Sequence, residues 1–144
     1  YFAWRHHLLP FERTGKPLYR EIVGGLMNPK GVIEALAAGR IDVGPLDSYC
    51  HDLFRHLLPE LAAKVRVIAT TDPTPMPPLV STAGLDAATI ERVRAAFLAV
   101  ENESSLAPLR SQLLLKRFVV PDGSVFDLQK SRASDVEREG IAWP

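Results

Sequence analysis

Two short stretches carry the polar side chains best suited to binding a small ligand. Asp47-Ser48-Tyr49 places a carboxylate, a hydroxyl and a phenol in a row, and Asn28-Pro29-Lys30-Gly31 places an amide and an ammonium around a proline. Each stretch comes between a short apolar run and a helical pattern, so each is expected at a helix start. Backbone N–H groups and the positive end of the helix dipole attract anions there. The candidate ligand-binding residues are Asn28, Lys30, Gly31, Asp47, Ser48 and Tyr49.

Each of these residues also has a purely structural interpretation. A carboxylate at a helix start is often only an N-cap, and Asp47 fits that role. As a ligand group, Asp47 would accept hydrogen bonds from an amine or a hydroxyl, with Ser48 and Tyr49 adding a hydroxyl and an aromatic wall. Asn28 and Lys30 are either a cap and a solvated lysine or the seat of an anion. The residue types alone leave both interpretations open.

The elements that would position these residues alternate between strands and helices. Residues 21–54 read as strand, turn, helix, strand, turn, helix, and Gly39 is expected to end the first helix. The apolar face of that first helix is Val32, Ile33, Leu36 and Ala37. Further helices are expected near 59–63, at 87–100, after a cap at Ser104 or Ser105, and weakly at 129–139. The expected strands are residues 18–23, 41–46, 65–70 and 79–82. This order predicts an α/β fold with a mostly parallel sheet flanked by helices.

A proline-rich segment divides the chain. Residues 72–78 hold four of the twelve prolines, and proline fixes φ and removes a backbone donor. The segment is either an ordinary rigid loop or a crossover between two lobes. We therefore expect residues 1–72 to carry the candidate site in a second-lobe α/β segment, residues 73–82 to form the crossover, and residues 83–144 to be a helical part that returns to the first lobe.

Composition excludes several functional classes. Seventeen basic side chains balance seventeen acidic ones, so no nucleic-acid-binding surface is indicated, and no apolar run is long enough to span a bilayer. Cys50 is the sole cysteine, and the four histidines (His6, His7, His51, His56) lack the spacing of metal ligands. No GxSxG, P-loop or GxGxxG motif occurs. We expect no catalytic residue, no metal and no cofactor.

Two longer segments resemble a known family. EALAAGRIDVGPLDSYCHDLF and PELAAKVRVIATTDPTPMPPLVS are similar to the substrate-binding proteins of phosphate/phosphite/phosphonate ABC transporters (PhnD-like), over the second half of a family member. In that family, a helix ending in Ala-x-x-x-Gly leads to an Asp-Val/Gly strand and an Asp-Ser/Ala-Tyr helix start. The resemblance also takes in residues 1–9, where Arg5 matches an early basic position of a helix.

The resemblance implies a fold, a ligand and a partner. It implies a type 2 periplasmic-binding-protein fold, here with a partial two-lobe architecture, that binds a small anionic, phosphate- or phosphonate-like solute between lobes. Asp47 would meet the amino or hydroxyl end of the solute. Met27-Asn28-Pro29 replaces the family's usual Gly-Ser-His and so lacks a histidine donor to an anionic oxygen. The implied partner is an ABC transporter permease, and the implied location is periplasmic or extracytoplasmic, membrane-associated through the transporter.

Two other functions occur on the same fold. A thiamine-pyrimidine synthase-like enzyme is suggested only by Cys50 and His51. An effector-sensing domain of a transcription regulator would carry its DNA-binding part upstream of Tyr1, since no helix-turn-helix or basic segment occurs in this sequence. Tyr1 is not methionine and lies within a predicted helix, so we expect this chain to be a piece of a longer protein. Uncovered sheet faces would then favour self-association or a partner chain.

Overall fold

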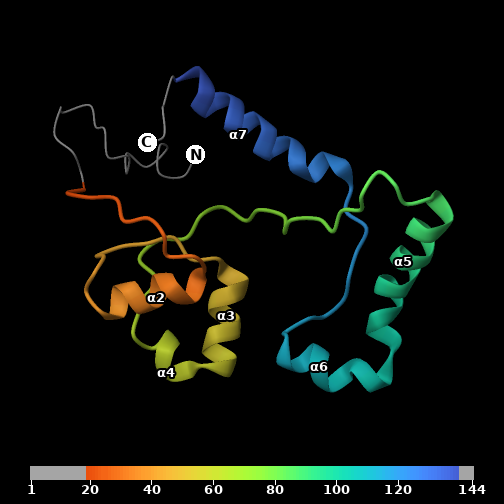
Figure 1. The fold of residues 1–144 in the computed structure, drawn as a ribbon, viewed down its shortest axis with the longest axis horizontal. Helices are drawn as coiled ribbons and strands as arrows, with labels where there is room; N and C mark the ends of the chain where they lie inside the picture. The colour runs from red at the N-terminus through yellow and green to blue at the C-terminus, as the bar shows by residue number, and fades with distance from the viewer. Residues whose placement is uncertain (1–18, 140–144) are drawn as a thin grey trace. The chain divides into compact units, whose positions relative to one another are not determined.

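Capping side chains mark where the helices begin. The computed structural model describes residues 19–139, in which α2 (Pro29–Ala37), α3 (Ser48–Leu57) and α5 (Ala87–Ala99) each follow a capping residue (Figure 1). Side-chain oxygens of Asn28, Asp47 and Asp86 accept the backbone N–H three residues later. Each bond satisfies one of the N–H groups that have no partner inside the helix. The predicted starts of these three helices are confirmed.

The chain divides into two compact units. Among the described residues, unit 2 consists of Val23–Ile68 and Leu79–Val120, and unit 1 of residues 19–22, Ala69–Pro78 and residues 121–139. Besides α2, α3 and α5, unit 2 contains α4 (Pro59–Ala62), α6 (Ala107–Gln112) and the 3-10 turns η1 (Val100–Asn102) and η2 (Ser104–Leu106). Unit 1 contains η3 (Gly123–Phe126) and α7 (Asp127–Arg138). The helix expected at residues 1–9, with Arg5, lies outside the described residues.

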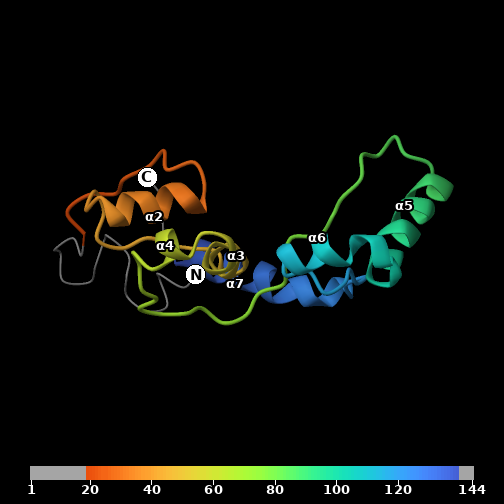
Figure 2. The ribbon, with the colours of Figure 1, turned by 90° about the horizontal axis from the view of Figure 1, so that it is seen from below.

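The core of unit 2 lies where α2 meets α4. Figure 2 shows α4 beside α2 and α3, and α4 contacts both helices. Ile33 and Ala35 of α2 and Ala62 of α4 are the buried apolar residues of the described chain. Ile33 has no exposed surface, whereas its predicted face partners Val32 and Leu36 are partly exposed. The helical periodicity therefore predicted the buried face correctly at Ile33, and the buried interior is small.

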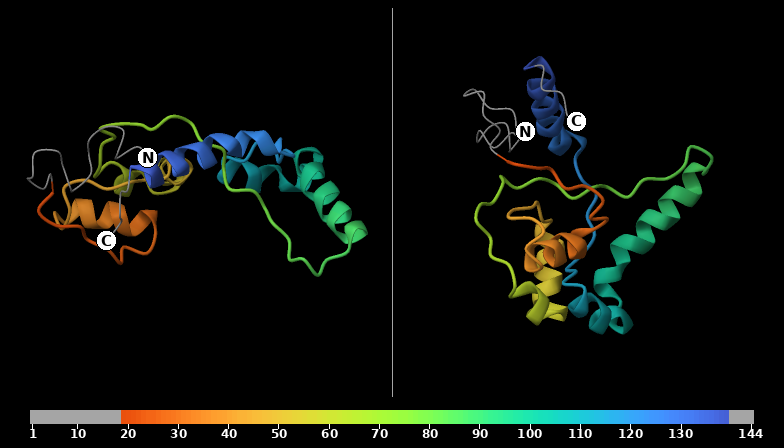
Figure 3. Two further views of the ribbon diagram at one scale, coloured as in Figure 1. Left: turned by 90° about the horizontal axis from the view of Figure 1, so that it is seen from above. Right: turned by 60° about the vertical axis from the view of Figure 1, so that its left-hand side comes forward.

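The predicted sheet is absent from the described residues. Residues 19–139 contain no β-strand, and the segments expected as strands (18–23, of which 19–23 are described, 41–46, 65–70 and 79–82) make no ladder hydrogen bonds. Figure 3 shows the chain between α4 and α5 running without regular structure. Val67, Ile68, Leu79 and Val80 are 61%, 64%, 69% and 87% exposed.

The fold-class prediction is therefore wrong. We expected an α/β, periplasmic-binding-protein-like (type 2) fold with a mostly parallel sheet and a partial two-lobe architecture, and the described residues are helical with irregular connections. The physical reason is that β-branched residues favour an extended backbone locally, but a strand exists only when a neighbouring segment pairs with it. No such pairing forms among the described residues.

Residues 79–120 form a helical arm that ends in an aromatic contact. The rings of Phe97 in α5 and Phe118 after α6 meet edge to face, with centroids 4.8 Å apart. Two 3-10 turns join the helices, and Glu103, not Ser104 or Ser105, supplies the cap: its carboxylate accepts hydrogen bonds from the N–H and hydroxyl of Ser105. The serine cap that we predicted is wrong because the 3-10 turn already begins at Ser104, which makes Glu103 the residue at the N-cap.

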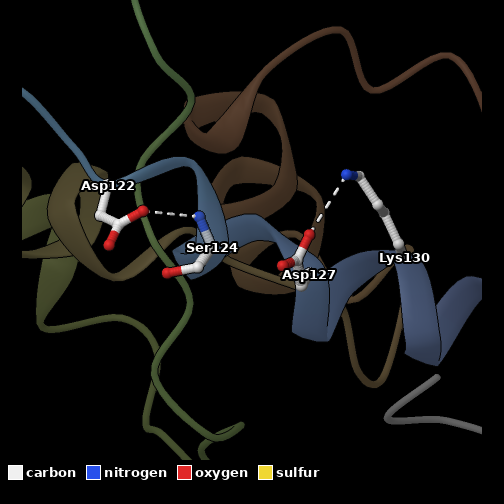
Figure 4. A network of polar contacts seen from close by, with 4 residues as sticks. All are labelled: Asp122, Ser124, Asp127 and Lys130. Atoms are coloured by element: carbon white, nitrogen blue, oxygen red, sulfur yellow. Dashed lines mark hydrogen bonds and ion pairs between the residues drawn. The ribbon is translucent and has the colours of Figure 1, made fainter.

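Charged side chains make local and long-range contacts around α7 in unit 1. Figure 4 shows Asp122 accepting the N–H of Ser124 (3.0 Å) at η3, and Lys130 Nζ lying 3.2 Å from Asp127 Oδ1 in the first turn of α7. Farther along α7, Arg132 Nη2 lies 2.9 Å from Asp72 Oδ2 in the proline-rich segment, 60 residues away in sequence. This pair attaches α7 to the residue that directly precedes the expected crossover.

Replacing Ile33 by alanine tests the small core. Ile33→Ala removes a fully buried side chain, so we expect the free energy of unfolding to fall by about 3 kcal/mol. Val93 in α5 is 47% exposed, so Val93→Ala serves as the control and should change the free energy of unfolding by less than about 1 kcal/mol. Urea unfolding followed by circular dichroism measures both. Equal effects of the two substitutions would show that α2 and α4 do not form the core.

Carboxylate caps make the helix starts sensitive to acid. The pKa of Asp86 is lowered by the N–H and hydroxyl of Thr89, that of Glu103 by the hydroxyl and N–H of Ser105, and that of Asp122 by Ser124. A lowered folded-state pKa stabilises the fold above the unfolded pKa, here near 4, and this contribution is lost as the pH falls further.

Circular dichroism at 222 nm from pH 6 to pH 2.5 measures that loss. Asp86→Asn keeps an acceptor at the N-cap but does not titrate, so we expect its helix signal to fall less with acid than that of the unmodified protein. Identical acid curves for both proteins would contradict the role given to the ionised Asp86 cap.

Candidate functional site

The start of α2 is a tight turn that admits only glycine at residue 31. The N–H of Asn28 donates to the carbonyl of Leu26 (2.7 Å), with Met27 between them at φ 64°, in the left-handed region that favours glycine. The Asn28 side chain then accepts the N–H of Gly31 at 3.0 Å. A Cβ on Gly31 would lie 2.1 Å from the Leu26 oxygen. Gly31 is therefore required by the close approach of the backbone.

Lys30 lies on the exposed side of this turn. Its Nζ is 3.6 Å from Glu34 Oε1 one turn along α2, and both side chains are about half exposed (54% and 53%). An exposed pair at this spacing stabilises a helix by only a few tenths of a kcal/mol. The ammonium is consequently available to an incoming anion at little cost.

The start of α3 combines a cap with a long-range contact. Asp47 Oδ1 accepts the N–H of Cys50 at 2.8 Å, and Ser48 is exposed. The hydroxyl of Tyr49 donates to the carbonyl of Leu113 at 2.8 Å. Burial of the Cys50 side chain, and secondarily its hydrogen bond and charge interaction with Asp47, raise the pKa of this thiol. Cys50 is thus a partly buried thiol with a raised pKa, which disfavours the reactive thiolate.

The two helix starts lie at the same end of the cluster that α2, α3 and α4 form (Figure 1, Figure 2). Asn28 and Asp47 each take the third N–H of their helix. The N–H groups of Lys30, Ser48 and Tyr49 belong to the first turns and have no acceptor within their own helices. These groups, with the Lys30 ammonium and the Asp47 carboxylate, are the binding chemistry that this end of unit 2 offers.

Backbone carbonyls are the part of this region that sequence reasoning missed. The carbonyl of Leu26 shapes the α2 start, and that of Leu113 receives the Tyr49 hydroxyl. No residue type signals either contact, since every residue carries a carbonyl. Within residues 19–139, no group of three His, Cys, Asp or Glu side chains is placed to hold a metal ion, and no helix is long and apolar enough to cross a membrane.

Comparison with known proteins identifies the family. A family model described as "ABC transporter, phosphonate, periplasmic substrate-binding protein" matches residues 9–126, well over half of the chain. Comparisons with curated proteins and with solved structures gave no match. The class is thus the solute-binding component of a transporter. More particularly, the chain belongs to the periplasmic phosphonate-binding family of ABC transporter substrate-binding proteins.

The family match confirms the resemblance drawn from the central segments and favours transport over the enzymatic and regulatory alternatives. Substrate-binding proteins of ABC transporters bind small solutes, work with permease components and are generally not enzymes. The family is periplasmic, which places its members outside the cytoplasm.

Substitution of Gly31 tests the geometry of the α2 start. Gly31→Ala would place a methyl group against the Leu26 oxygen, so the first turn of α2 must shift, and we expect a loss of about 3 kcal/mol in the free energy of unfolding. Gly24→Ala is the matched control because a Cβ there meets no atom within 4 Å, and its effect should stay within about 0.5 kcal/mol. Chemical denaturation distinguishes the two. A well-tolerated Gly31→Ala would refute the tight turn.

Proposed function

We propose that this chain binds a small anionic metabolite, phosphate- or phosphonate-like, at the starts of α2 and α3, as the solute-binding component of an ABC importer. The observation that carries the proposal is the family match over residues 9–126. The proposed binding residues are Asn28, Lys30, Gly31, Asp47, Ser48 and Tyr49.

The anionic end of the solute has a chemical counterpart at these helix starts. Phosphonate oxygens accept hydrogen bonds, and the first-turn N–H groups of Lys30, Ser48 and Tyr49 are donors without acceptors in their own helices. The positive ends of the two helix dipoles add to the attraction. The Lys30 ammonium, only weakly engaged with Glu34, supplies a full positive charge. Together these groups take the place of the histidine donor that the Met27-Asn28-Pro29 sequence lacks.

The other end of the solute would meet Asp47. Its Oδ1 accepts the Cys50 N–H, which leaves acceptor capacity on Oδ2 for an amine or a hydroxyl. The residue is exposed, so a solute can reach it without displacing other side chains. In this role, Asp47 acts as cap and ligand at once, and the two interpretations drawn from the sequence are compatible.

Transport follows from differential binding. In the proposed cycle the solute stabilises a closed form because it makes contacts there that an open form lacks. The closed form then binds the permease. This contact holds the protein at the membrane surface that faces away from the cytoplasm. No catalytic step is part of this function.

Paired phosphonates test the role of Asp47. The probes are 2-aminoethylphosphonate, which carries an amine, and ethylphosphonate, which does not. Asp47→Asn keeps a cap but removes the charge, so we expect at least about tenfold weaker binding of the amine-bearing probe and less than about threefold change for the other. Isothermal titration calorimetry gives both dissociation constants.

Two controls complete this test. Asp86→Asn alters a cap at the start of α5, far along the chain from the proposed site, and should leave both affinities unchanged. Lys30→Met should weaken both probes equally, since it acts on the phosphonate group that they share. Unaltered binding in Asp47→Asn would remove Asp47 from the site, and failure of the unmodified protein to bind either probe would contradict the proposed ligand class.

A further inference from the structure

The hydroxyl of Tyr49 makes a contact that the proposed binding chemistry does not use. It donates to the backbone carbonyl of Leu113 at 2.8 Å, across 64 residues of sequence. No other side-chain hydrogen bond in the described part of unit 2 spans more than six residues. The bond therefore joins the α2–α3–α4 cluster to the arm formed by α5 and α6, both of which belong to the same unit.

The acceptor lies at a strained helix end. Leu113 caps the C-terminus of α6, and Leu114 follows at φ 51°, a left-handed conformation that leucine rarely adopts. The N–H groups of Leu114 and Leu115 donate back to carbonyls of α6, at 3.2 and 2.8 Å, in the pattern that usually has glycine at this position. Strain of this kind persists only where surrounding contacts hold it. Neither of these two bonds uses the Leu113 carbonyl, which instead accepts the hydrogen bond from the Tyr49 hydroxyl.

The chemistry of the phenol limits what else Tyr49 does. A phenol has one hydrogen to donate, and here that hydrogen is given to Leu113. Its oxygen then offers only lone pairs, which repel an anionic oxygen. The backbone N–H of Tyr49 remains a donor, whereas the side chain is engaged with α6.

We propose that Tyr49 is a positioning residue: its hydroxyl ties the start of α3, which carries Asp47, to the end of α6, and does not contact the solute. The proposal rests on the proposed function for the site that it positions. The tether itself is a property of the protein without solute, so it is testable on its own.

Amide hydrogen exchange on the full chain tests the tether. Tyr49→Phe removes only the hydroxyl, and we expect exchange to become about fivefold faster at the amides of both Cys50 and Leu115, at the two ends of the bond. Tyr19→Phe, which removes the same group in unit 1, should leave both amides unchanged. An unaltered exchange rate at Leu115 in Tyr49→Phe would overturn the proposal.

A second variant separates the tether from general loss of stability. Leu114→Gly relieves the left-handed strain, so in the Tyr49→Phe background it should restore slow exchange at Leu115 but not at Cys50. If slow exchange returned at both amides, or at neither, this would contradict the proposal that the bond acts on the start of α3 and on the end of α6 separately.

The response to solute tests whether the Tyr49 hydroxyl stays on Leu113 and does not contact the solute. With methylphosphonate as the probe, the ¹³C shift of the Leu113 carbonyl should stay unchanged at saturation while amides at the starts of α2 and α3 move. A Leu113 shift that moves to its value in Tyr49→Phe would show that the hydroxyl leaves for the solute and would overturn the assignment. If no resonance responds to methylphosphonate, the proposed function fails for this probe, and the exchange data still decide the tether.

Discussion

The caps of α2 and α3 are the constraint on which the candidate site depends. Asn28 and Asp47 each bring a side-chain oxygen back onto the third N–H of the helix. This fixes the direction in which the first-turn N–H groups point while leaving the earliest of them without acceptors. The close approach of Leu26 to Gly31 reinforces the geometry at α2, and the Tyr49 hydrogen bond reinforces it at α3. Removal of either cap would disperse the donors that an anion requires.

Little apolar burial supports these helix starts. The buried apolar side chains of residues 19–139 come from α2 and α4 alone, and many large apolar residues of the irregular segments are exposed. Stability in unit 2 therefore depends heavily on local hydrogen bonds at helix ends, together with the Phe97–Phe118 contact and the Tyr49 tether. In unit 1, the Asp72–Arg132 pair has the corresponding long-range role.

The helices were predictable from the sequence, whereas the absence of the predicted sheet from the described residues was not. Asp47 and Asp86 act through an N–H three residues away, so a local pattern suffices to predict them. The apolar segment 65–70 also favours a local conformation, but a strand requires a partner whose presence no local pattern reveals. Glu103 caps in place of the predicted serines because the 3-10 turn begins at Ser104, and the sequence pattern did not fix that boundary to the residue. The bond between Tyr49 and Leu113 was beyond prediction because its acceptor is a backbone atom 64 residues away.

The family match and the polar first turns of α2 and α3 together support the proposed capture of a small anionic solute there. A titration of the ¹⁵N-labelled chain with methylphosphonate, followed by amide chemical shifts, tests it most directly. If the solute binds at these helix starts, saturable shifts should be concentrated at Lys30, Ser48 and Tyr49. Saturable shifts confined to other segments, or no shifts at millimolar probe, would contradict it.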